Sequence, residues 1–417
     1  MAGVIIGLVL LIFLVYRRLS IVIAAPVSAI VVALINFLPP AQVLSAYLAG
    51  MGDFIQKFFL LFLLGAVFGN VYGDSGAALT LGRGLGRLVG KQHTVTAIAL
   101  TGATLTFGGV SSFVVIFTLY PVGMALLREA NLPERLFMAA FGVGTVTFAM
   151  TAPGSPQIQN LLPIGYMHTT ATAGLIPGTA AAAVIGLSGM IYLERQAAVA
   201  CRRKEGFSGE SFHAEKRTLP SLWKSVLPLS VTVLLLDVFK WEPAYAMTGG
   251  VAAALLCLYR YLEEPVQTLN RGAGMAGLAL LSAASSVAFG TAARQVPGFV
   301  AGINRLMQIR AHPLIIAALV TNLAVAVTGS SNGGLALAIT VTQGHLATTG
   351  ADPALLHRVM VLASGVLDTL PHNNSYLTAL VVTGLSHRNT YKEYFFATVL
   401  IPFLGLAVAM AIIFWQG

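Results

Sequence analysis

Long apolar runs constrain this chain more than any other feature of its sequence. Ten of them suit a helix that crosses the hydrocarbon core of a bilayer, which takes about 20 mostly apolar residues. They cover residues 2–16, 19–38, 54–72, 131–162, 168–192, 222–239, 243–262, 273–291, 353–384 and 393–415. We expect helices because a helix satisfies its own backbone hydrogen bonds in lipid.

The composition supports this interpretation. Hydrophobic residues make up 57% of the chain, charged residues only 9%, and the mean hydropathy is +0.82. Soluble domains carry roughly 25% charged residues, so this chain has too little charge to coat a soluble globule. With only two cysteines, Cys201 and Cys257, a disulfide scaffold is excluded as well. The class is polytopic membrane protein.

Two further apolar stretches, residues 93–127 and 313–350, are too long for one crossing. Small and polar residues interrupt each in the middle, as GGVSS at 108–112 and TGSSNGG at 328–334. Both patterns predict re-entrant hairpins that enter and leave the membrane on one side. Their non-helical tips must face protein or water, because lipid offers no hydrogen-bond partner.

The net charge of +9 is distributed unevenly. With the N-terminus outside, all but six of the 24 Lys and Arg residues fall on the inner side. The exceptions are Lys57, Lys240, Arg294, Arg305, Arg310 and Arg358. The positive-inside rule then places both termini outside the cytoplasm. Segment 193–220 mixes acidic with basic residues, so we interpret it as a cytoplasmic linker and not as a nucleic-acid surface.

The linker separates two halves that share one order of elements. A single shift in register places Val110–Ser112 on Ser330–Asn332 and Pro133 on Pro353. Five crossings per half is an odd number, so the halves must face opposite ways across the membrane. We predict an all-α inverted repeat of five crossings plus one re-entrant hairpin per half, with residues 1–192 as the first repeat and 221–417 as the second. Inverted repeats with broken helices are typical of secondary transporters.

Two crossings carry residues that interrupt a helix. The string APGSPQIQN at 152–160 lies in the predicted broken helix 131–162, and LPHNNS at 370–375 lies in the predicted broken helix 353–384. Proline removes a backbone donor and clashes with the preceding turn, so each helix should stop and restart at the midplane. The N-terminus of a restarted helix carries a partial positive charge that suits a carboxylate.

Polar side chains at both breaks and both hairpin tips form the candidate site. Such groups are costly in mid-membrane unless used, although small polar residues also pack helices together. The candidate substrate-binding residues are Ser111, Ser112, Ser155, Gln157, Asn160, Ser330, Ser331, Asn332, Asn373 and Asn374. Asp368 and His372, beside the second break, are the candidate proton-coupling residues; capping of the break is the alternative role. Because no Lys or Arg falls in the tips or breaks, an anion would rely on dipoles and neutral donors.

Enzyme-like strings are weaker. GLSG at 186–189 resembles the nucleophile motif of intramembrane serine proteases, with Ser188 as the candidate. A base must lie within hydrogen-bond reach of such a serine, and His372 falls in the other half. GRGLGR at 82–87 follows no predicted strand and is a poor nucleotide fingerprint. Metal-ligand spacings are absent from the sequence, and we expect neither a metal nor a cofactor.

Two long segments resemble the gluconate permease family. They are residues 73–136, beginning GDSGAALTLGRGLGRLVG, and residues 295–356, beginning QVPGFVAGINRLMQIRAHP. The resemblance implies an inverted-repeat carrier of the ion-transporter superfamily, many of whose members are dimers. It also implies import of gluconate, related sugar acids or 3-hydroxybutyrate, typically with protons. Members carry an acidic residue at the first hairpin tip, where this chain has Gly109-Val110-Ser111-Ser112, which favours a shorter, less hydroxylated acid.

Together the residues and the resemblance predict a secondary active transporter and not an enzyme. It would import a small hydroxy-monocarboxylate, such as 3-hydroxybutyrate or gluconate, with protons, by elevator-type alternating access. The expected partners are this carboxylate, protons, the lipid bilayer and a second copy in a homodimer; nucleic acid is not among them. The expected location is the bacterial inner membrane, as a multi-pass protein. A sodium-coupled or exchanging carboxylate carrier is the alternative, and an intramembrane serine hydrolase using Ser188 a distant one.

The charge distribution generates a test of topology. A reporter inserted within residues 193–220 should be active as a cytoplasmic fusion, and one fused after Gly417 should be active only outside the cytoplasm. Paired reporters, each active on one side of the membrane, measure this. Linker and C-terminus on the same side would contradict both the topology and the inverted repeat.

Overall fold

The computed structural model describes residues 2–17, 19–110, 112–208, 218–371 and 373–416, and within those ranges all regular structure is helical. The first part of the chain forms α1 (Ala2–Tyr16), α2 (Ile21–Ile35), α3 (Pro40–Asp74), α4 (Ala77–Val89), η1 (Lys91–His93), α5 (Thr94–Phe107), α6 (Ser112–Glu129), α7 (Leu136–Thr145), α8 (Phe148–Thr151), α9 (Ile158–Leu161), α10 (Ile164–Met167) and α11 (Leu175–Arg202).

The second part follows the segment that contains residues 203–221. It forms α12 (Leu222–Val233), η2 (Leu234–Val238), α13 (Pro243–Leu258), η3 (Tyr259–Tyr261), α14 (Pro265–Ala293), α15 (Pro297–Met307), α16 (Pro313–Thr328), α17 (Ser331–Ala347), α18 (Pro353–Ser364), α19 (Asn374–Thr383), α20 (His387–Phe395), η4 (Phe396–Leu400) and α21 (Ile401–Gln416). The expected all-α architecture is confirmed.

Several helices begin where the sequence offers a proline or a capping side chain. α3, α13, α14, α16 and α18 each have proline in the first turn, where a backbone N–H would lack a helical partner in any case. The side chain of Asp352 caps α18 by accepting a hydrogen bond from the Ala354 N–H. These local signals fix the element boundaries next to the hairpins.

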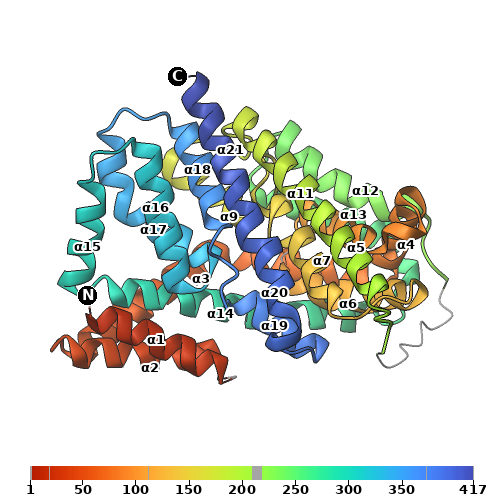
Figure 1. Ribbon diagram of the computed structural model, residues 1–417, viewed down its shortest axis with the longest axis horizontal. Helices are drawn as coiled ribbons and strands as arrows, with labels where there is room; N and C mark the ends of the chain where they lie inside the picture. The colour runs from red at the N-terminus through yellow and green to blue at the C-terminus, as the bar shows by residue number, and fades with distance from the viewer. Residues whose placement is uncertain (1, 18, 111, 209–217, 372, 417) are drawn as a thin grey trace.

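The contacts between helices divide most of them into two groups, whose members are labelled in Figure 1. The first, here called the α3–α14 group, contains the long pair α3 and α14 together with α1, α2, α12 and α13, which pack on that pair or on one another. The second, here called the hairpin group, contains α5–α11 and α16–α21. Within it α5 packs on α7, α11 on α21, and α18 on α16 and α21. The two groups meet mainly where α14 contacts α17 and α3 contacts α6, and α4 contacts both α12 of the first group and α5 of the second.

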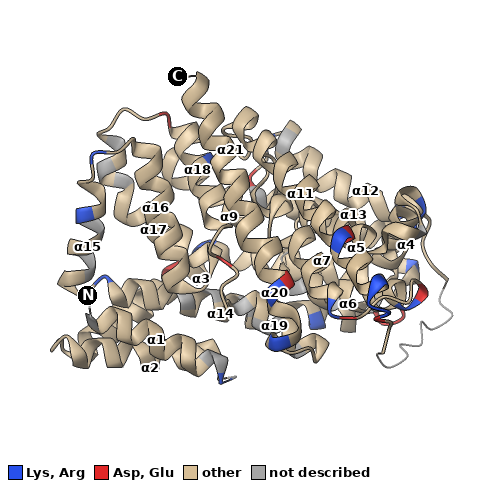
Figure 2. Cartoon of the chain, in the orientation of Figure 1, with Lys and Arg blue, Asp and Glu red and all other residues tan. Residues whose placement is uncertain are grey.

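Four helices of the described residues are long and apolar enough to cross a membrane. They are Pro40–Asp74, Leu175–Arg202, Pro265–Ala293 and the continuous helix His387–Gln416. In Figure 2 the charged residues lie largely at helix ends and connections, and most of the helical residues are uncharged. Large apolar side chains such as Leu187 and Leu256 stand exposed on the helices, 64% and 86% accessible. A surface of this kind is stable in lipid and not in water.

α5 packs on α6 and α16 on α17, so each pair forms a helical hairpin. In the second, α16 ends at Thr328 and Gly329 caps it with a φ of 62°, in the left-handed region that glycine adopts without strain. α17 then returns along α16 so closely that a Cβ atom on Gly334 would lie 2.3 Å from the Cα of Val325. Only glycine permits this contact, which holds the hairpin tip in place.

Both interrupted helices stop and restart within the hairpin group. α8 ends at Thr151, the chain turns through Ala152–Pro156, and α9 begins at Ile158. In the second, α18 ends at Ser364 and α19 begins at Asn374. The polar segment that follows the first half also differs from a plain linker, because α11 continues to Arg202.

The contact at Gly334 generates a test of the fold. Gly334→Ala forces α16 and α17 apart, and overpacking of this kind costs about 1–3 kcal/mol. We expect a lower free energy of unfolding, measured by thermal unfolding of the purified protein in detergent. Gly344→Ala is the matched control, because Gly344 lies on the same helix with no atom within 4 Å of an added Cβ. Equal stability of the two variants would contradict the close approach of the helices.

Candidate functional site

One small cavity lies where the two breaks meet the two hairpins. Its volume is about 20 Å³, room for roughly one water molecule. The lining residues come from α3, from both hairpins and from both breaks: Phe62, Ser112, Gln157, Ile158, Gln159, Gly329, Ser330, Ser331, Asn332, Asp368, Asn373 and Ser375. Segments far apart in the sequence therefore share one polar site.

Asp368 supplies the carboxylate of this cavity and is only 3% exposed. Its Oδ1 accepts hydrogen bonds from the backbone N–H of Ser331 at 2.8 Å and from Nδ2 of Asn373 at 2.9 Å. Ser331 is the first residue of α17, so the carboxylate lies at a helix N-terminus, where negative charge is stabilised.

Asn373 joins three segments. Its Oδ1 accepts from the Tyr376 N–H at 2.8 Å and so caps α19, while Nδ2 donates to the Gly329 carbonyl at 3.1 Å and to Asp368. The hairpin turn, the break and the restarted helix are thereby fixed together. This side chain is 2% exposed and makes three hydrogen bonds within the protein, so it fixes the geometry of the site.

Glutamines of the first break reach both hairpins. Gln157 Nε2 donates to the carbonyls of Thr106, at 2.7 Å, and Val110, at 3.1 Å, at the end of α5. Gln159 Nε2 donates to Oγ of Ser331 at 2.7 Å, across to the second hairpin. Gln159 escaped the sequence prediction, although it lies in the same string as Gln157 and Asn160.

The predicted site residues divide into three sets. Ser112, Gln157, Ser330, Ser331, Asn332, Asp368 and Asn373 line the cavity. Ser155 and Asn160 turn to carbonyls of the first break instead: Ser155 Oγ donates to Ala149, and Asn160 Nδ2 donates to Ser155 and Ala171. Ser111 and His372 lie outside the described residues, and Asn374 begins α19 with its side chain outside the description.

Asn332 differs from its neighbours because its Oδ1 is buried without a hydrogen-bond partner among the described residues. The side chain is 7% exposed and lines the cavity. A buried polar atom left unpaired costs free energy. This oxygen is free to accept a hydrogen bond from a molecule in the cavity.

Two ionisable residues on α18 escaped the sequence prediction. Arg358 was counted among the basic residues on the outer side of the membrane, and the structure shows its side chain fully buried, like that of His357. Asp368 therefore has further buried ionisable residues near it in sequence. The error arises because the positive-inside rule counts charges along the chain and carries no information on the depth of a single residue.

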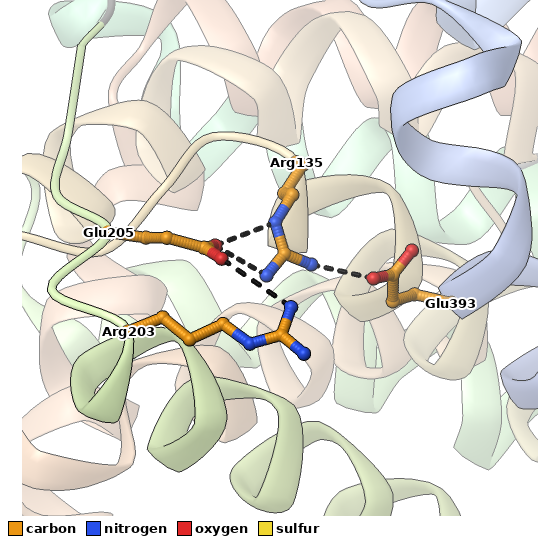
Figure 3. Close-up of polar contacts among 4 residues, drawn as sticks. All are labelled: Arg135, Arg203, Glu205 and Glu393. Carbon is orange, nitrogen blue, oxygen red and sulfur yellow. Dashed lines mark hydrogen bonds and ion pairs between the residues drawn. The ribbon is translucent and has the colours of Figure 1, made fainter.

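Arg135 forms a second polar cluster, shown in Figure 3. Its guanidinium bonds Glu205 through Nε at 3.0 Å and Nη2 at 2.6 Å, and Glu393 through Nη1 at 2.6 Å. Nη1 of Arg203 lies 3.9 Å from Oε1 of Glu205. The cluster ties the start of α7 and the segment after α11 to α20, so this arginine is neutralised by two carboxylates.

Ser188, the candidate nucleophile, makes its hydrogen bonds within its own helix. Its Oγ donates to the carbonyls of Val184 and Ile185. No general base among the described residues contacts it. The geometry thus gives the hydrolase alternative no support.

A membrane-embedded helical bundle whose broken helices and hairpins enclose one polar cavity defines a membrane transporter. The chain belongs to the GntP permease family, since the model of that family, described as "GntP family permease", matches residues 1–269. It is 32% identical to the uncharacterized transporter YxjC of Bacillus subtilis (strain 168), with 95% of each chain covered. The sequence resemblance to gluconate permeases is therefore confirmed, and the chain is a transporter and not an enzyme.

Two further relatives extend the comparison. A high-affinity gluconate transporter of Escherichia coli (strain K12) is 26% identical, with 86% of each chain covered. The crystal structure of the YdaH transporter of Alcanivorax borkumensis matches with a TM-score of 0.57 at 13% identity, covering 87% of each chain. The last similarity shows a shared fold.

The two cavity asparagines generate a test. Asn373→Ala removes a helix cap and two buried hydrogen bonds, and should lower the free energy of unfolding by about 2–4 kcal/mol. Asn332→Ala removes an oxygen that has no hydrogen-bond partner among the described residues, so stability should change by less than about 1 kcal/mol. Thermal unfolding in detergent measures both. A severe loss in Asn332→Ala would assign this residue a packing role.

Proposed function

We propose that this permease imports a small hydroxy-monocarboxylate, such as 3-hydroxybutyrate or gluconate, together with protons. The observation that carries the proposal is the convergence of helix N-termini on one cavity. α6 begins at Ser112, α17 at Ser331 and α19 after Asn373, and each of these residues lines it. Helix N-termini attract anions through unpaired N–H groups and the helix dipole.

The charge of the cavity supports protons as the coupling ion. Asp368 is the acidic residue among those that line it, and an ionised carboxylate repels a bound anion. Two unit charges 4 Å apart repel by about 4 kcal/mol at an effective dielectric constant of about 20. A proton on Asp368 removes this repulsion, so proton and anion binding favour each other.

The size of the cavity supports alternating access. A volume of about 20 Å³ holds roughly one water, so a hydroxy-acid enters only when hairpins and breaks separate. We assign the hairpin group to a moving unit and the α3–α14 group to a scaffold that forms the homodimer. The inner-membrane location, the inverted repeat and the placement of both termini outside the cytoplasm belong to the same proposal.

The unpartnered Oδ1 of Asn332 favours a second candidate, a sodium-coupled carrier. Sodium is a hard cation that prefers oxygen ligands, like Ca²⁺ and Mg²⁺. Asn332, Ser330 and Asp368 offer such oxygens around one cavity. Under this alternative the cation replaces the proton as the charge that offsets the substrate.

Uptake into liposomes tests the function. The purified protein should accumulate labelled 3-hydroxybutyrate or gluconate when the lumen is alkaline. An anion that enters against an inside-negative potential costs about 2.3 kcal/mol per 100 mV, which the proton gradient supplies. Asp368→Asn should abolish uptake driven by the pH gradient while exchange of substrate for substrate continues.

The matched control is Asp53→Asn, because Asp53 is an exposed carboxylate paired with Lys57 away from the cavity. Its uptake should equal that of the wild type. Uptake that ignores a pH gradient but requires a sodium gradient would reject protons and select the second candidate. Substrate exchange without net uptake under either gradient would identify an exchanger.

A further inference from the structure

Arg358 is the basic residue with a fully buried side chain among those described. Its Nε donates to the Ala173 carbonyl at 2.8 Å, Nη1 to Thr151 at 2.7 Å and Nη2 to Ala171 at 3.1 Å. Thr151 is the last residue of α8, and a helix C-terminus favours a cation. The first break is therefore closed by an arginine of the second half.

The chain is shaped to receive this side chain. A Cβ on Gly174 would lie 2.5 Å from Cβ of Arg358, and one on Gly178 would lie 2.7 Å from its Cδ. Both glycines lie at the start of α11. The guanidinium thus occupies a pocket lined by backbone carbonyls, and its three hydrogen bonds fix its position.

The positive charge in this pocket has no acidic partner among the described residues. All three of its hydrogen bonds go to neutral carbonyls, whereas Arg135 contacts two carboxylates. Burying an unpaired charge is expensive, and neutral donors would serve carbonyls at lower cost. The charge itself is the property that needs explaining.

Asp368 is the buried acidic residue of the same region. It follows Arg358 on the stretch formed by α18 and the second break, so both charges travel on the proposed moving unit. The unit then carries one fixed positive charge and one that a proton can neutralise. We propose that Arg358 is the counter-charge that compels one proton and one monocarboxylate to cross together; this inference rests on the proposed function.

The net charges of the four possible states of the unit show why proton and anion would cross together. The empty unit with ionised Asp368 is neutral, and so is the unit loaded with both anion and proton. Loaded with the anion alone it carries −1, and with the proton alone +1. A net charge is costly in a low-dielectric membrane, so the unit crosses in its two neutral states. Uptake is then electroneutral, with one proton for each anion.

Other titratable groups leave this count unchanged when neutral. His357 lies beside Arg358 and bonds Thr169 Oγ1 through Nδ1 at 2.6 Å; a proton on it would add a second positive charge. His168 lies on the connection after α10, which packs on α18. Tyr394 is close enough to Asp368 to interact electrostatically and carries a neutral hydroxyl. His372 lies outside the described residues.

Carboxylate uptake by a variant without the positive charge tests the inference. In Arg358→Gln the unit that carries only a proton is neutral, and the unit that carries both proton and anion has a charge of −1. The variant then returns with its proton after it releases the anion, so each cycle moves one anion and no proton. Uptake into liposomes should become slower, independent of a pH gradient and faster at an inside-positive potential set with potassium and valinomycin. A barrier raised by about 1.4 kcal/mol lowers a rate tenfold, and we expect about tenfold or more.

Three further variants separate charge from packing. Arg358→Lys keeps the charge with fewer hydrogen bonds to carbonyls, so its uptake should still follow the pH gradient and ignore the potential even if its stability falls. Arg358→Gln combined with Asp368→Asn should behave like Arg358→Gln, because its empty unit is neutral and its loaded unit has a charge of −1. Gly174→Ala, which disturbs the pocket but keeps the charge, should lower stability while uptake still follows the pH gradient. A purely structural Arg358 would leave uptake by Arg358→Gln driven by the pH gradient and independent of the potential, and so overturn the inference.

The wild type supplies a test that needs no variant to fold. At a fixed pH gradient, the initial rate of carboxylate uptake should be the same at inside-negative and inside-positive potentials, with one proton entering per anion. A clear dependence on potential would overturn the inference while leaving the function intact. Absence of proton-linked uptake in the wild type would instead reject the proposed function.

Discussion

Everything in the centre of this protein follows from one constraint, which is that a backbone group buried in a membrane must find a hydrogen-bond partner within the protein. Two helices stop in the interior and leave carbonyls and N–H groups unpaired. Side chains from elsewhere in the chain fill the gaps. Arg358 serves the carbonyl of Thr151, Asn373 serves that of Gly329, and Gln157 serves those of Thr106 and Val110.

The polar site is a consequence of these hydrogen bonds between side chains and unpaired backbone groups. The groups that close the breaks also face one another, so they enclose a cavity with several donors and one carboxylate. Most of them are saturated by the protein, as Asn373 is, and so fix geometry. The Oδ1 of Asn332, by contrast, has no hydrogen-bond partner among the described residues. This division separates the residues that build the cavity from those that remain able to bind a ligand.

The two arginines that follow the hairpins illustrate how surroundings decide the role of one residue type. Arg135 lies at the start of α7 between Glu205 and Glu393, which neutralise its charge. Its ion pairs connect α7 to α20 and to the segment after α11. Arg358 lies on α18 among carbonyls, and its charge persists in the interior. A neutralised arginine contributes to stability, whereas a persistent charge influences which loaded states cross a membrane.

The sequence by itself determined the class, the helices and the family. Apolar length gives membrane helices, and the prolines at 153 and 156 stop one because they lack an N–H, so α8 ends at Thr151. These are local effects, readable within a few residues. Much of the candidate site could also be named from the sequence, because small polar residues amid apolar runs are conspicuous.

Only the tertiary structure decided how these residues are used. Gln159 meets Ser331, and Arg358 meets Ala171 and Ala173, across separations of well over a hundred residues. Arg358 can be buried because Gly174 and Gly178 leave space for its side chain. Ser155 and Asn160 point away from the cavity because they donate to carbonyls near the first break. Sequence patterns contain residue type and spacing. A buried polar side chain instead bonds to the nearest unpaired group in space, and the order of residues along the chain does not specify which group that is.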